Sequence, residues 1–101
     1  MSIDFRRKNI SFTDRTGAAV IKTVSVTFDS QVIKADVAIS GFQLYFTGTD
    51  RPIYHEKVYA TVSAVSGNTV TVTVEAGLRD HSGTYDDPFS GKVDILVIAD
   101  V

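Results

Sequence analysis

The sequence contains no cysteine and no tryptophan, and only two prolines among its 101 residues. The lack of cysteine excludes disulfides, thiolate chemistry and cysteine-ligated zinc sites. No apolar run approaches the roughly 20 residues that a transmembrane helix needs, so we expect no insertion into a membrane. The formal net charge is only −2. Because nucleic-acid binding needs clustered positive charge to hold phosphates, we expect none.

The first residues, MSIDFR, lack the apolar core of a secretory signal peptide. We therefore expect synthesis in the cytoplasm, followed either by retention there or by release without a signal, for example through lysis. Release by that route would place the protein outside the cell or on the surface of a virion.

Alternating apolar and polar residues dominate from about residue 20 onward, and a period of two is typical of strands with one buried face. Residues 57–64 and 69–75 both alternate in this way, and the link Ser66-Gly67-Asn68 between them predicts a hairpin. Further strands are predicted at 20–28, 31–40, 42–46 and 92–101. The phase changes across Ser40-Gly41, which predicts a bulge where the chain could pass from one sheet to another.

These five or six strands predict an all-β antiparallel sandwich, with a closed barrel as the alternative. A chain of this length suits one domain with its own core. Residues 20–101 are expected to form the sandwich. Residues 1–19 have a weaker pattern and are interpreted as an N-terminal arm or an edge segment, in which the basic run Arg6-Arg7-Lys8 would dock on a partner.

No residues form a recognisable catalytic motif, so we expect neither enzymatic activity nor a cofactor. Of the two histidines, His55 precedes Glu56 and could act as a base that the carboxylate orients, but we interpret these two residues as an exposed loop pair. In the polar loop 79–91, Asp80, Asp86 and Asp87 offer the oxygen ligands that calcium prefers. Acidic residues also favour turns for conformational reasons alone.

The same loop mixes a cation, acids, a histidine and an aromatic ring. Charged groups of this kind hydrogen-bond sugar hydroxyls, and an aromatic ring covers the apolar face of a sugar. A solvated loop without any ligand has the same composition, so both interpretations stay open at this point.

From residue 22 onward the order of segments resembles the H-type lectin domain family, which includes the snail agglutinin and discoidin C-terminal domains. The resemblance rests on VSVTF at 24–28, VAISGF at 37–42, KVYATVSAV at 57–65, TVTVTV at 69–74 and VDILVIA at 93–99. It implies a six-stranded antiparallel β-sandwich that assembles as a homotrimer. It also implies glycan sites between subunits, often for N-acetylgalactosamine.

The resemblance implies that Lys57 stands where the family usually has an arginine, and that Arg79 follows the next strand as a polar contact. Tyr85 or His81 would replace the family's tryptophan. Asp80 and Asp14 complete the implied set of ligand-binding residues. The alternative is a structural or receptor-binding component of a phage or virion-like assembly that has no conventional sugar site.

Overall fold

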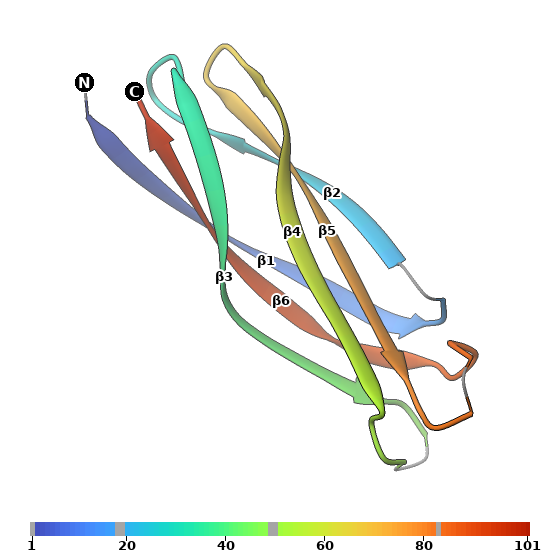
Figure 1. Ribbon diagram of the computed structural model, residues 1–101. Coiled ribbons are helices and arrows are strands. Elements are labelled where there is room, and N and C mark those ends of the chain that lie inside the picture. Colours follow the sequence, from blue (N-terminus) through green and yellow to red (C-terminus); the bar gives the residue numbers. More distant parts are fainter. Residues whose placement is uncertain (1, 18–19, 49–50, 83) are drawn as a thin grey trace.

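The computed structural model describes residues 2–17, 20–48, 51–82 and 84–101. Within these residues the chain is all-β, with six antiparallel strands and no helix, so the predicted fold class is confirmed. The strands, shown in Figure 1, are β1 (Ile3–Arg15), β2 (Val20–Thr27), β3 (Lys34–Phe46), β4 (His55–Ser66), β5 (Thr69–Arg79) and β6 (Phe89–Asp100).

The strands form two three-stranded sheets, ordered β1-β6-β3 and β2-β5-β4. Only β4 and β5 follow one another within a sheet, as the predicted hairpin, and Gly67 in its turn has a φ of 59° that favours glycine. Every other connection crosses from one sheet to the other. Because most strands have 11 to 13 residues, the molecule is a rod of 49 × 18 × 18 Å.

The core lies between the two central strands, where the alternation in the sequence is most regular. On β5 the inward residues Val70, Val72 and Val74 are completely buried, and on β6 so are Val93, Ile95 and Val97. Burial of this apolar surface is the main favourable contribution to folding. Large aromatic rings close the two ends of this layer, with Phe28 near one end and Phe12 and Phe89 at the other.

Residues 3–15 form a regular edge strand and do not project as an arm. β1 pairs with β6 from Ile3 to Phe12, and an irregularity follows before Arg15. The segment's weak pattern reflects polar residues on its inward side, because the guanidinium of Arg6 lies 4.9 Å from the ring centroid of Phe28. Arg6 therefore covers the chain's own core.

The predicted bulge is present between Ile39 and Gly41, but the predicted change of sheet there is wrong. The ladder with β6 resumes at once, with Gly41 opposite Asp94, and continues to Phe46. The two short strands predicted at 31–40 and 42–46 are therefore one strand, β3, that stays beside β6 along its length. A bulge adds one residue and shifts the phase without ending the pairing.

The two open sides of the sandwich differ in what covers their apolar residues. On the β1–β2 side, Lys22 Nζ lies 5.2 Å from the ring centroid of Phe12, and Arg6 covers Phe28. The β3–β4 side, which we call the β3–β4 seam, has no such cover among the described residues. Its inward residues from Val37 to Phe42 on β3 and from Val58 to Val65 on β4 are half-buried or exposed, and Ile39 and Phe42 remain 36% and 45% exposed. The seam comprises Val37, Ile39, Phe42, Val58, Ala60, Val62 and Val65.

At Gly91 the β1-β6-β3 sheet leaves no room for a side chain. A Cβ there would lie 1.9 Å from the Gln43 carbonyl oxygen, and its φ of 147° is strained for other residues. We expect Gly91→Ala to lower the free energy of unfolding by about 3 kcal/mol or more, since both crowding and strain oppose it. Urea denaturation followed by circular dichroism measures this change.

Gly41→Ala is the matched control, because a Cβ at Gly41 meets no atom within 4 Å. It should change the stability by no more than about 0.5 kcal/mol. Equal losses in the two variants would contradict the close approach of β3 and β6 at Gly91.

Candidate functional site

Three loops meet at one end of the rod, opposite the two chain termini (Figure 1). Backbone hydrogen bonds join them: Gly17 N–H donates to the Tyr85 carbonyl at 3.0 Å, and Thr47 N–H donates to the Pro88 carbonyl at 3.0 Å. These bonds fix the β1–β2, β3–β4 and β5–β6 connections relative to one another. The described residues of the three loops are therefore joined into one surface.

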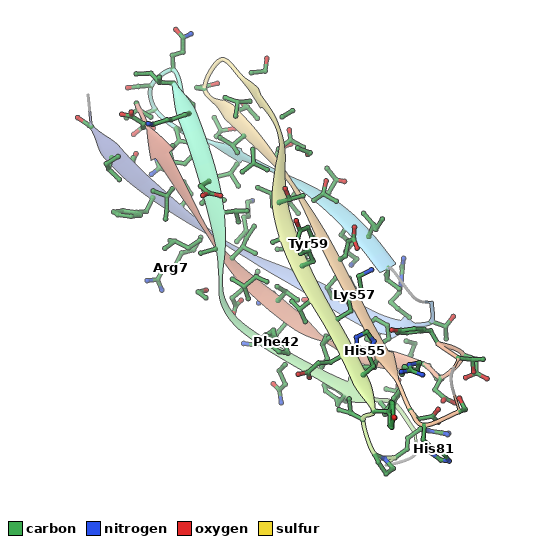
Figure 2. All side chains as sticks on the ribbon, viewed as in Figure 1. Arg7, Phe42, His55, Lys57, Tyr59 and His81 are labelled. Atoms are coloured by element: carbon green, nitrogen blue, oxygen red, sulfur yellow. The ribbon has the colours of Figure 1, made fainter. Side chains whose placement is uncertain are left out.

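Next to the loops, a row of chemically active side chains lies on the outer face of the β2-β5-β4 sheet. His55, Lys57 and Tyr59 follow one another along β4 (Figure 2) and share this face because side chains on a strand alternate. Their partners on β5 are Arg79, Gly77 and Glu75, in that order. A bulge between Val62 and Ala64 sets this register, and without it His55 would face Asp80 instead.

Lys57, Tyr59 and Glu75 form the most complete part of this row. Lys57 Nζ lies 3.3 Å from Glu75 Oε2, and the Tyr59 ring is 56% exposed. They border a shallow depression of about 450 Å³, which Glu56 and Val58 also line. An ammonium, carboxylates and an open aromatic face provide hydrogen-bond donors, acceptors and an apolar platform within one small area.

Arg79 and Tyr85 extend this row toward the loops, Arg79 through Tyr54 and Tyr85 through His55. The Arg79 guanidinium lies 5.1 Å from the ring centroid of Tyr54, a cation–π distance. The Tyr85 hydroxyl hydrogen-bonds to Nδ1 of His55, and the two rings meet edge-on. His55 is therefore positioned by Tyr85. It is not oriented by Glu56, whose side chain leaves the strand on the opposite face.

Asp80 and Asp87 meet around Arg51 instead of facing the row. Arg51 Nη1 lies 3.4 Å from Asp80 Oδ2 and 3.4 Å from Asp87 Oδ1, and Asp80 is only 5% exposed. Hydrogen bonds from the Ser82 hydroxyl and backbone hold the pKa of Asp80 well below its usual range. Partial burial and the neighbouring Asp80 raise the pKa of Asp87. The cluster is a cross-link between two loops.

The calcium candidates are only partly brought together. Asp80 and Asp87 are adjacent, but the guanidinium of Arg51 already lies between their carboxylates, and Asp86 is exposed to solvent. Over the described ranges of the chain, no three histidine or acidic side chains gather closely enough to hold a metal ion.

The other two predicted ligand residues lie apart from the row. His81 is exposed in the turn after β5, where Figure 2 shows it at the tip of the molecule. Asp14 is on β1 in the opposite sheet, with a φ of 47°, and its N–H donates to Ser90 Oγ at 3.0 Å. Sequence reasoning missed Tyr54, Tyr59 and Glu75, although the odd-numbered alternation of the hairpin places Tyr59 and Glu75 on the same face as Lys57.

Comparison of the chain with protein-family models, curated proteins and solved structures finds no match. No helix long and apolar enough to cross a membrane occurs in the part of the chain that the structure describes.

The Arg51 cluster predicts a pH-dependent contribution to stability. Because the pKa of Asp80 is lowered from 3.8 in the folded chain, its ionised form stabilises the fold above that pH, and this contribution is lost as the pH falls further. We expect Asp80→Asn to lower the melting temperature at pH 7, and the difference from the unmodified chain to shrink below about pH 4. Thermal denaturation across this pH range measures the difference.

Asp86→Asn removes an exposed carboxylate of the same loop that forms no ion pair with Arg51, and it should change the melting temperature much less than Asp80→Asn does. A loss for Asp80→Asn that stays constant down to pH 2 would show that its charge does not matter.

Proposed function

We propose that this chain is a carbohydrate-binding, lectin-like module that assembles as a homotrimer. In this proposal the glycan binds in the depression of Lys57, Tyr59 and Glu75, where two subunits meet. Arg79 and Tyr85 extend the surface toward the loops. The observation that carries the proposal is the position of this depression at the border of an uncovered apolar seam.

The β3–β4 seam supports self-association because its residues are apolar and face inward, yet they remain partly exposed to solvent. Phe42 pairs with the fully buried Val93 across the sheet, yet the Phe42 ring is 45% exposed. The opposite side of the sandwich protects its aromatics with Lys22 and Arg6. An apolar surface left in contact with water on one side only is typical of an interface. A cyclic assembly would bury the seam of every copy.

The depression lies beside this seam because both belong to the edge strand β4. Val58 points inward to the seam, while its neighbours Lys57 and Tyr59 point outward and, with Val58, line the depression. A second subunit packed on the seam would therefore form the outer wall of the depression. This accounts for a sugar site that is shallow in a single chain.

The chemistry of the depression suits a sugar ring. The Lys57 ammonium donates hydrogen bonds, the Glu75 carboxylate accepts them, and both partners of a charged pair form stronger bonds than neutral groups. The exposed ring of Tyr59 can cover the apolar C–H face of a pyranose. The resemblance to H-type lectins favours an N-acetylgalactosamine-type glycan and a trimer as the assembly.

A structural or receptor-binding role in a phage or virion-like assembly is the second candidate. The molecule is a narrow rod with both termini at one end and the structured loops at the other (Figure 1). A chain attached through either terminus would therefore present the loop end outward. This geometry suits the tip of a fibre, and it is compatible with a sugar site on the same surface.

The solution mass tests the assembly. Three copies of the 11.0 kDa chain give about 33 kDa by light scattering. Phe42→Glu should reduce the mass to about 11 kDa, because it places a charge in the buried interface. Tyr45→Glu is the control, since Tyr45 is equally exposed on the same strand but is separate from the seam. A monomeric unmodified chain would contradict the proposal.

A glycan array followed by calorimetry tests the sugar site. Tyr59→Ala and Lys57→Ala should each weaken binding by about tenfold or more, because each removes a contact with the sugar. Thr61→Ala, one position further along the same face, should bind as the unmodified chain does. Unchanged affinity in both site variants would place the sugar elsewhere, and a trimer that binds no glycan would favour the structural role.

A further inference from the structure

A second hollow lies at the opposite end of the rod, on the outer face of the β1-β6-β3 sheet near the termini. Its volume is about 290 Å³, and its walls are mostly aliphatic. Ile3 on β1 and Ile98 on β6 provide the apolar part, and Lys34, Ala35 and Asp36 on β3 close one side. Asp100 also lines this groove, between Ile3 and Lys34 in the sheet register.

Asp100 is unusual because it is a buried carboxylate with an unused oxygen. The residue is only 4% exposed, and its Oδ1 has no hydrogen-bond partner among the residues that the structure describes. A buried polar atom without a partner costs free energy comparable to a lost hydrogen bond. A donor that entered the groove would remove this cost, so the site favours a ligand that carries hydrogen-bond donors.

The charges at this end of the rod favour a cationic donor. Arg6 takes up two carboxylates, those of Asp4 at 3.0 Å and Asp29 at 3.7 Å. Asp36 and Asp100 remain beside the groove with Lys34 as the nearby base, and none of these three forms an ion pair within 4 Å with another residue that the structure describes. Two carboxylates against one ammonium leave room for one more positive charge.

We propose that this groove binds the side chain of a lysine from a protein partner. The four methylenes of a lysine would pack against Ile3 and Ile98, and its ammonium would donate to Asp100. Ile3 and Lys34 flank Asp100 and are exposed, so both side chains can turn aside to admit the ammonium.

A polypeptide is favoured over a free amine because the groove has an apolar border. Phe5, on β1, is 54% exposed, and Ile33, just before β3, is 67% exposed. Both lie near the groove. Residues on either side of the inserted lysine would cover this border, which a small amine would leave in contact with water. The groove is at the end opposite the proposed sugar site, so the two sites can be occupied together.

The test is an NMR titration of the intact chain with a blocked glycine–lysine–glycine peptide. Saturable shifts of the backbone amides of Ile3, Ala35, Ile98 and Asp100 are expected, and the same peptide with an acetylated lysine should cause none. Asp100→Asn, which keeps the shape and removes the charge, should weaken binding by about tenfold. Asp36→Asn is a second variant with an exposed side chain, and it should weaken binding less.

Lys34→Met separates this proposal from its simplest rival, in which Lys34 itself swings over to pair with Asp100. The proposal predicts that this variant binds the peptide at least as well as the unmodified chain. Binding by Lys34→Met alone would show that Lys34 is the native partner and would overturn the proposal. Equal shifts with the acetylated peptide, or none with either peptide, would overturn it as well.

Discussion

The packing of β5 against β6 is the contact on which the rest of the molecule depends. These two strands are central in their sheets, and their inward residues, Val70, Val72, Val74, Val93, Ile95 and Val97, have no exposure to solvent. Each of the other four strands reaches the core only as an edge partner of one of them. The positions of the loops, the row on β4 and the groove beside β6 therefore all follow from the register of this central pair.

Covering the edges of this central layer is the main constraint that remains. On the β1–β2 side, the long basic side chains of Arg6 and Lys22 cover aromatic rings and shield them from water. On the other side the chain places valine, isoleucine and phenylalanine at the border and leaves them partly exposed. Such an unfinished side is costly in a monomer. In the proposed assembly, another copy of the chain covers this side.

The strands and the hairpin could be predicted because alternation of apolar and polar residues indicates a β-strand wherever one face of the strand is buried. Gly41 also revealed its bulge, since the phase of apolar residues changes there. The continuation of β3 beside β6 could not be predicted, because a phase change does not say which strand lies alongside. β1 was interpreted weakly for a related reason: Arg6 and Lys8 occupy inward positions, and only the structure shows Arg6 lying over Phe28.

The candidate site was harder to predict than the fold. Lys57, Arg79 and Tyr85 do lie near one another, but Asp80 turns away because Arg51, a residue distant in sequence, binds its carboxylate. The partners of Lys57 depend on a single extra residue at the β4 bulge, since that residue decides whether Glu75 or its neighbour faces Tyr59. Pairing of this kind depends on the register between the strands, and the register cannot be deduced from amino-acid composition.

The arrangement of the termini has a mechanical consequence. β1 and β6 run antiparallel, so the chain ends leave the same end of the rod, where Ser2 and Val101 exchange two backbone hydrogen bonds of 2.9 and 2.8 Å. A force that pulls the two termini apart would load the hydrogen bonds between β1 and β6 one after another, so the two strands would separate progressively from that end. A force between a terminus and the loop end would load the whole β1–β6 ladder at once, in shear. The protein should therefore resist tension along its length far better than tension between its own ends.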